Sequence, residues 1–202
     1  MKRSKNILAI GAHPDDVEFG CGGALLLLKE LGYKINIVDL TRGEKASRGA
    51  DKRIEEAQRA SEILGIPRKV YNLGDQQILL TNKCKQDIEK IIGKDNPDII
   101  FAPYFIDKHL DHANVGKLVS SFPRVIHYFI SDIKNENLGV DITKVYQTKI
   151  DALNVHKSQI RFNDMCLAEN RFKKYGNKLG VEWGELFYVK NDIELPDIFK
   201  KL

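Results

Sequence analysis

Short apolar runs alternate with amphipathic segments along the first two-thirds of the chain. The apolar runs predict strands over residues 7–10, 35–40, 69–73 and 98–104. The segments between them carry apolar residues at helical spacing and predict helices over 23–31, 51–64 and 83–92, with a further helix starting near residue 111. Strands that alternate with helices are typical of βαβ units. We therefore expect an α/β fold with a Rossmann-like, mostly parallel sheet and helices on both faces.

The pattern changes after residue 121. It predicts a strand over 125–130, helices over 141–157 and 161–178, an edge strand over 185–189 and a polar tail over 192–202. No linker or shift in composition separates this part from the rest. We therefore expect residues 1–202 to form a single domain with a variable C-terminal third, from about residue 122 onward.

The composition is that of a globular protein, with 43% apolar and 30% charged residues. The longest aliphatic run, Ala24–Leu28, is far shorter than the ~20 residues of a membrane span, and the basic N-terminus lacks the features of a signal peptide. The three cysteines are widely spaced, which indicates a reducing compartment. We expect a cytoplasmic protein. A net charge of +4 without a basic block argues against nucleic acid as a partner.

A first cluster of reactive side chains follows the first predicted strand, in the sequence His13-Pro14-Asp15-Asp16. Ligands of such folds bind beyond the carboxyl ends of the strands, so this is an expected place for a site. Neighbouring carboxylates point in different directions, and one can bind a metal while the other faces a substrate. The alternative is that Asp15 or Asp16 only caps the following helix.

A second cluster, Asp107-Lys-His109-Leu-Asp111-His112, follows the strand at 98–104 and so lies at the same edge of the sheet. Two histidines and a carboxylate, with the fourth position left to water, are typical of a catalytic zinc site. We assign His13, Asp16 and His112 as ligands of one Zn²⁺ per chain. Asp15 is then the general base, and His109 is an unligated acid or polarising group.

Other features of the sequence leave alternatives open. Arg48 and Arg53, near the end of the second strand, are candidates to meet an anionic group of a small-molecule substrate. Gly20-Cys-Gly-Gly23 and Asp39 resemble parts of a dinucleotide site, but Leu25 stands where the fingerprint needs glycine, so helix packing explains the glycines better. His127 lies in an apolar run and is expected to be structural. A metal-dependent phosphoesterase and a non-catalytic sugar- or nucleotide-binding module remain competing functions.

Four motifs together resemble the PIG-L/LmbE-like zinc de-N-acetylases: Ala12-His-Pro-Asp-Asp16, Gly20-Cys-Gly-Gly23, Asp39-Leu-Thr-Arg-Gly-Glu44 and His109-Leu-Asp-His112. The resemblance extends from about Lys5 to Phe187. The pieces Lys157-Ser-Gln159 and Gly180-Val-Glu-Trp-Gly-Glu185 are most similar to the bacillithiol-type branch. The resemblance implies a hydrolase that removes acetate from an N-acetylglucosaminyl conjugate by cleaving an amide C–N bond.

The resemblance also implies roles for individual residues. It supports the same metal ligands and the same base, and it places the oxyanion-stabilising and amine-protonating histidine at His109, with Asp111 beside it. It places Glu44 and Arg53 in the substrate site. Two departures stand out: Leu110 replaces the usual proline, and the stretch after His112 is shorter than in many relatives. The shorter stretch is expected to alter the pocket wall and any interface there. Whether the chain forms a homo-oligomer is left open.

Overall fold

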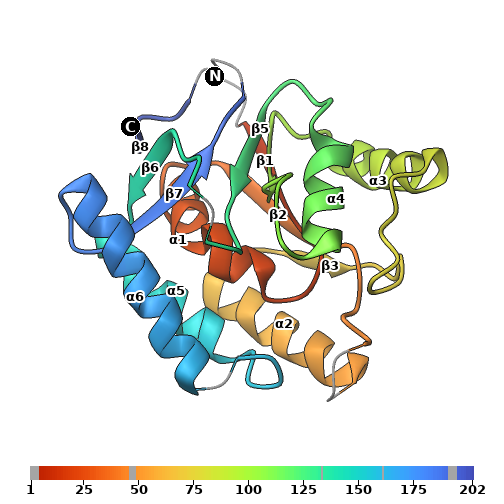
Figure 1. Cartoon of the computed structure of the whole chain (residues 1–202), viewed down its shortest axis with the longest axis horizontal. Coiled ribbons are helices and arrows are strands. Elements are labelled where there is room, and N and C mark those ends of the chain that lie inside the picture. The colour runs from red at the N-terminus through yellow and green to blue at the C-terminus, as the bar shows by residue number, and fades with distance from the viewer. Residues whose placement is uncertain (1–4, 46–48, 133, 161, 191–194) are drawn as a thin grey trace.

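The computed structural model describes residues 5–45, 49–132, 134–160, 162–190 and 195–202. One sheet of eight strands forms its centre, with helices packed on both sides (Figure 1). The strands are β1 (Asn6–Gly11), β2 (Lys34–Asp39), β3 (Arg68–Val70), β4 (Ile99–Pro103), β5 (Val125–Tyr128), β6 (Leu138–Asp141), β7 (Gly184–Tyr188) and β8 (Phe199–Lys201). The helices are α1 (Asp16–Glu30), α2 (Ala50–Leu64), α3 (Asn82–Asp95), α4 (Leu110–Val119), η1 (Thr143–Val145), α5 (Tyr146–Asn154) and α6 (Phe162–Leu179). None of the helices in this part of the chain is both long enough and apolar enough to cross a bilayer.

The sheet has a parallel part and an antiparallel part. Its strand order is β3-β2-β1-β4-β5-β7-β6-β8, and the first five strands run parallel to one another. Strands β7, β6 and β8 extend this sheet with antiparallel pairs. The expected Rossmann-like architecture is therefore confirmed, and the C-terminal third completes the same sheet.

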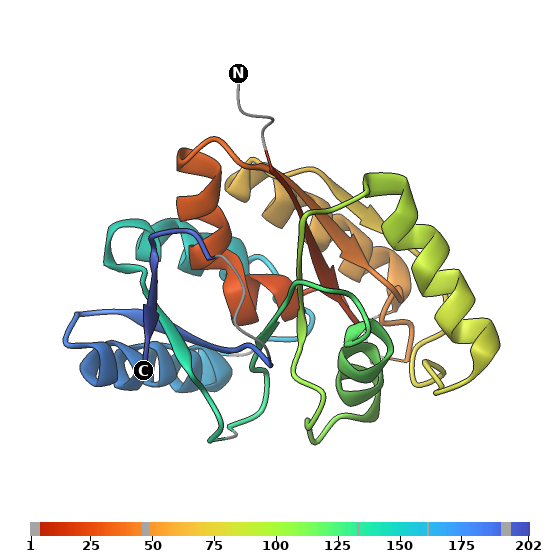
Figure 2. The same ribbon diagram turned by 90° about the horizontal axis from the view of Figure 1, so that it is seen from above.

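The core lies on both faces of the parallel part. Side chains of a strand alternate between faces, so Ile7 and Ala9 of β1 pack with the cluster that includes α1, whereas Leu8 and Ile10 pack with the cluster that includes α3 and α4. Helices α1, α2 and α5 cover the first face and α3 and α4 the second (Figure 2). This double cover explains why the strand sequences are continuously apolar instead of alternating.

Several predicted boundaries were wrong. Helix α1 begins at Asp16, seven residues before the expected start, because its glycines weaken the helical pattern but are required by packing: a Cβ at Gly20 would overlap the ring of Tyr128. Helix α3 continues beyond Gly93 and ends where Asn96 adopts a left-handed conformation.

The C-terminal third differs most from the prediction. Strand β7 lies inside the sheet, between β5 and β6, and the expected polar tail supplies the edge strand β8. Strand β6 was missed, and the predicted helix over 141–157 is split into η1 and α5. The predicted helix over 161–178 is α6, although residue 161 lies outside the described residues. Long-range strand pairing decides these elements, and local periodicity does not report it.

The parallel strands place their carboxyl ends at one edge of the sheet. The chain leaves β1 in one direction and β4 in the other, toward α1 and α4 respectively, so the crevice between these neighbouring strands is the topological switch point of the fold. The two reactive clusters, at 13–16 and 107–112, follow β1 and β4 directly. The fold thus brings them to the same crevice.

His127 of β5 lies away from this crevice, in an aromatic environment. Its Nδ1 lies 2.9 Å from the carbonyl oxygen of Pro103, and its ring contacts those of Tyr104, Phe105 and Tyr188. Burial lowers the pKa of His127 to about 4. These contacts agree with a structural role.

We predict that His127 makes the protein less stable as the pH falls from about 6.5 to about 4. In this window the unfolded chain binds a proton that the folded chain does not, so stability is lost, by up to about 3 kcal/mol. Urea unfolding of the wild type and of His127→Gln at pH 7 and pH 5 measures this contribution. An equal loss in both proteins would contradict it.

Candidate active site

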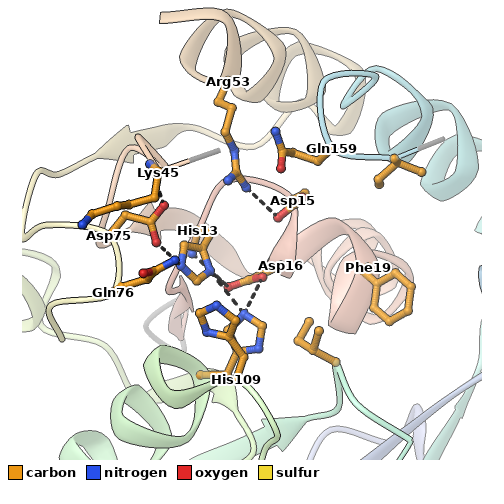
Figure 3. Close-up of a pocket in the computed structure, with 13 residues that line it drawn as sticks. His13, Asp15, Asp16, Phe19, Lys45, Arg53, Asp75, Gln76, His109 and Gln159 are labelled. Atoms are coloured by element: carbon orange, nitrogen blue, oxygen red, sulfur yellow. Dashed lines mark hydrogen bonds and ion pairs between the residues drawn. The ribbon is translucent and has the colours of Figure 1, made fainter. Parts of the chain in front are cut away.

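A cavity of about 370 Å³ opens at the carboxyl edge of the parallel strands (Figure 3). Its walls come from the loops after β1, β2, β3, β4 and β5, from α2, and from the segment after α5. The lining residues are His13, Asp15, Asp16, Phe19, Lys45, Arg53, Asp75, Gln76, His109, His112, Ile130, Gln159 and Ile160. Five predicted site residues with catalytic or metal-binding roles therefore meet in one cavity, together with Arg53.

The loop after β1 turns sharply at Pro14 and Asp15. Asp15 has φ 110° and ψ −26°, a backbone conformation that favours glycine, and the N–H of Asp16 lies 3.4 Å from the carbonyl oxygen of His13. Arg53 supports this turn: its Nη2 donates to the carbonyl of Pro14 at 2.7 Å and to Asp15 Oδ1 at 3.3 Å. The Asp15 side chain makes no capping hydrogen bond to α1, so helix capping does not explain this residue.

Three predicted ligand side chains converge beside this turn. His13 Nδ1 lies 3.2 Å from His112 Nε2, His112 Nε2 lies 3.1 Å from Asp16 Oδ1, and His13 Nδ1 lies 3.7 Å from Asp16 Oδ2. Two ligand atoms of a tetrahedral zinc site are separated by roughly 3.3 Å, given Zn–N and Zn–O distances near 2 Å. Asp16 Oδ2 also accepts hydrogen bonds from the main-chain N–H groups of Ala12 and His13, which orients the carboxylate.

Further carboxylates hold the far side of each histidine ring. Asp107 Oδ1 lies 3.1 Å from His112 Nδ1. Asp75 Oδ1 and Asp111 Oδ2 lie 3.1 and 3.2 Å from His13 Nε2. Metal-binding histidines usually donate their second ring N–H to such a group, which fixes the ring and its tautomer.

The carboxylates make this site favourable for positive charge. Burial lowers the pKa of His13, but hydrogen bonds with Asp111, Asp16 and Asp75 raise it overall to about 12. Burial likewise opposes the charge of His112, and Asp16 and Asp107 raise its pKa to about 9. Without a metal, both imidazole rings are therefore protonated. Their positive charge lies where the neighbouring carboxylates would also stabilise a metal cation. The donor set and its electrostatics fit a divalent metal ion.

Two groups of possible ligands are found among the described residues: His13, His109 and His112, and His13, Asp75 and Asp111. Both include His13, whose Nδ1 faces the first group and whose Nε2 faces the second. A neutral imidazole has one free acceptor nitrogen, so the two groups compete for His13 instead of forming two sites. Asp75 and Asp111 fit the role of outer partners.

His109 lies across the cavity from the turn at Pro14 and Asp15. The centroid of its ring lies 4.9 Å from that of His13 and 4.7 Å from that of His112. It is the N-cap residue of α4, and its Nδ1 accepts from the N–H of Asp111 at 3.3 Å. Burial and the neighbouring His112 and His13 lower the pKa of His109. In the neutral ring, Nε2 therefore carries the proton.

The remaining predicted residues occupy different positions. Glu44 Oε1 accepts from the N–H of Asp75 at 2.7 Å, and Glu44 is absent from the cavity wall. Asp111 is buried behind His13 and accepts from the N–H of Gln76. Arg53 is buried and supports the turn at Asp15, and Arg48 lies outside the described residues.

Sequence reasoning missed Asp75 and gave no role to Asp107. Asp75 follows β3, and the rule that selected the other clusters, polar residues after a strand, would also have selected it. Asp107 stood within the second cluster. Its role was not recognised because its contact with Nδ1 of His112, on the side of the ring away from the other ligands, leaves no pattern in the sequence.

The chain matches the family of GlcNAc-PI de-N-acetylases (PIG-L) over residues 8–122, more than half of its length. It belongs to this family. Diacetylchitobiose deacetylase of Thermococcus kodakarensis is 28% identical over 188 residues, which cover 77% of this chain and 70% of that protein. A probable N-acetyl-alpha-D-glucosaminyl L-malate deacetylase of Bacillus anthracis is 24% identical over 92% of this chain and 94% of its own.

The solved structures agree with this assignment. The conserved protein TT1542 from Thermus thermophilus superimposes with a TM-score of 0.86 at 25% identity, covering 95% of this chain and 97% of that one. The resemblance to PIG-L/LmbE-like de-N-acetylases and the expected single-domain α/β fold are therefore confirmed.

We predict that Asp15→Gly is more stable than Asp15→Ala and that both lack activity, because both lose the carboxylate that Arg53 binds and only glycine relieves the strain. Glycine adopts the positive φ of residue 15 without strain, which favours the folded state by about 1 kcal/mol, partly offset by the more flexible unfolded chain. Thermal unfolding measures the effect. Asn96→Gly, at the positive-φ end of α3, is the control and should leave activity unchanged. Equal stability of Asp15→Gly and Asp15→Ala would show that the turn is not strained.

We also predict a difference in metal content between variants of the assigned ligands and variants of the outer carboxylates. Asp16→Asn and His112→Ala should lose most of one bound divalent ion per chain, because they remove ligands. Asp75→Asn should retain the ion with affinity lowered by about 10- to 100-fold, as expected for an outer partner. Elemental analysis and chelator competition measure both. Complete loss in Asp75→Asn, with retention in Asp16→Asn, would reverse the assignment.

Proposed function

We propose that the protein is a zinc-dependent hydrolase that removes acetate from an N-acetylated amino sugar carried on a conjugate. The observation that carries this proposal is the convergence of His13, Asp16 and His112 beside two groups that are not ligands, Asp15 and His109, in one cavity. The similarity to deacetylases that act on diacetylchitobiose and on glucosaminyl malate supports an amino sugar as substrate.

The reaction adds water across the amide C–N bond. A divalent ion held by His13, Asp16 and His112 would polarise the acetyl carbonyl and lower the pKa of water at the site. Asp15 accepts one proton from the attacking water, and its carboxylate is held toward the cavity by the turn that Arg53 supports. The C–N bond breaks when the nitrogen receives a proton, and acetate and the free amine leave.

His109 supports the proposal from the opposite side of the cavity. Because its Nδ1 accepts from the main chain, its Nε2–H is the donor available to the oxygen of the tetrahedral intermediate. The geometry thus favours His109 as a hydrogen-bond donor that polarises the oxygen, and not as an acid that gives up its proton. An acid would need the cationic ring, with a second proton at Nδ1. Asp15 is then the group that returns the proton to nitrogen.

The competing functions have weaker support. A two-metal phosphoesterase needs two separate ligand sets, whereas both groups here depend on His13. A non-catalytic binding module has no need for an aspartate held in a left-handed conformation beside the ligands, since such conformations cost free energy and concentrate at functional sites.

An anionic aglycone on the substrate stays a proposal, but we no longer assign its recognition to Arg53. Arg53 is engaged by Pro14 and Asp15, so its charge is already compensated. Lys45 lies in the cavity wall (Figure 3), and within the described part of the chain its main-chain N–H binds Asp75 while no ion pair of its ammonium is found. We propose Lys45 as the residue that meets an acidic aglycone. A role in the cytoplasm and a homo-oligomeric state also remain predictions.

We predict acetate release from N-acetylglucosamine conjugates by the metal-loaded protein, tested with malate, inositol, nucleotide diphosphate and lipid aglycones. Asp15→Asn is the matched control, because it should keep its metal and lose about 10²–10⁴-fold in turnover. Lys45→Met should raise KM for the malate conjugate and leave a neutral conjugate unaffected. No acetate release from any member of the panel by metal-loaded protein would contradict the proposal.

We predict that His109→Gln retains more activity than His109→Ala. The glutamine amide can still donate a hydrogen bond, whereas it cannot act as an acid, and removal of an oxyanion donor typically lowers kcat by about 10²–10³-fold. Steady-state kinetics of both variants with unchanged metal content decide the role. Equal losses in the two variants would favour proton donation by His109.

A further inference from the structure

Helix α1 changes direction part-way along its length, as the ribbon shows in two views (Figures 1 and 2). In a regular α-helix the N–H of Gly23 would donate to the carbonyl of Phe19. Here Glu185 Oε1 accepts from the N–H of Gly23 at 2.8 Å, and Glu185 Oε2 accepts from the N–H of Ala24 at 2.8 Å. A residue of β7 thus binds main-chain groups in the middle of the helix.

Lys149 of α5 binds two main-chain carbonyls in the preceding turn of α1. Its Nζ donates to the carbonyl of Glu18 at 2.6 Å and to that of Phe19 at 2.7 Å. The same Nζ lies 2.8 Å from Glu185 Oε1, and both side chains are almost completely buried. The three N–H groups of the ammonium therefore each have an acceptor. A side chain inserted into the main-chain ladder is a recognised cause of a sharp helix bend.

The glycines of α1 fit this arrangement. A Cβ at Gly23 would come too close to Ile142 and to the carboxylate of Glu185, and a Cβ at Gly20 would overlap Tyr128. Tyr128 in turn donates from its hydroxyl to the carbonyl of Ile10 at 2.7 Å. The bend is therefore a packed feature of the fold, in which buried side chains bind two main-chain N–H groups and two main-chain carbonyls of α1.

The bend decides where the catalytic turn lies. The first segment of α1 begins at Asp16, directly after Asp15, and carries Phe19 in the cavity wall. The second segment packs in the core through residues such as Leu25 and Leu28. The angle between the segments therefore fixes the position of both aspartates relative to His112, which belongs to a different helix.

We propose that Lys149 and Glu185 are positioning residues of the active site, which hold the first segment of α1 at the angle that presents Asp15 and Asp16. The turnover part of this inference rests on the proposed deacetylase function. The metal-binding part rests only on Asp16, which shares the first segment and lies beside His13 and His112.

The decisive variant is the double substitution Lys149→Met with Glu185→Leu. Replacing a buried ion pair by apolar side chains often preserves stability, whereas removing one partner leaves a buried charge unpaired. Without the pair, the helix can form its regular main-chain bonds and straighten. We expect a folded protein whose kcat falls by about 10²-fold, with a smaller change in KM, because a shift of about 1 Å at the reacting groups costs this much.

The same variant should release its metal to a chelator faster than the wild type. The control is Lys144→Met with Glu30→Leu, which removes an exposed ion pair at the other end of α1 and should change neither kcat nor metal retention. If the double variant does not fold, Lys149→Met with Glu185→Gln replaces it, because it leaves no buried charge unpaired, and the amide keeps the shape of Glu185 but loses the acceptor for the N–H of Ala24. Wild-type kcat and wild-type metal retention in a folded variant would overturn the proposal.

A failure of the proposed deacetylase function can be distinguished from a failure of the positioning role. A wild-type protein that releases no acetate contradicts the deacetylase assignment, and the positioning role is then decided by metal retention and by amide hydrogen exchange at Gly23 and Ala24. Faster metal release together with changed exchange at these amides supports the role. For a wild type that releases no acetate, unchanged metal retention in the folded double variant contradicts the positioning role.

Discussion

The carboxylate of Asp16 joins the two halves of the site. One oxygen accepts from the main-chain N–H groups of Ala12 and His13, and the other faces His112 of α4, the helix that follows β4. This contact is available only because β1 and β4 are neighbours in the sheet and both end at the same edge. The strand order brings this group to His112, and the outer carboxylates hold the two histidine rings beside it.

Beneath this carboxylate the protein buries further charges that are paired with one another. Arg68 at the start of β3 lies 2.6 Å from Glu18 and 3.2 Å from Asp39, and all three side chains are inaccessible to solvent. Asp39 is therefore part of the core and not a ribose-binding residue. A buried charge without a partner is costly, so these pairs tie α1, β2 and β3 to one arrangement.

The parts of the molecule that could be predicted from the sequence are those in which a cluster of reactive residues directly follows an apolar strand. The apolar run of β1 and the cluster after it identified His13 and Asp16, and the strand-end rule then linked them to His112. The role of Lys149 was out of reach, because it depends on main-chain carbonyls of a bent helix, and no pattern of side chains reports these. The interior position of β7 was missed for a similar reason, since strand pairing between distant segments is not local.

The dependence of α1 on Glu185 has a consequence for how the protein is made. Both reactive clusters lie within residues 8–122, the part that matches the family, and they are synthesised before α5 and β7. A nascent chain that contains every proposed metal ligand therefore still lacks Lys149 and Glu185, to which we assign the angle of the turn at Asp15. With this assignment, completion of the polypeptide is the event that assembles the centre.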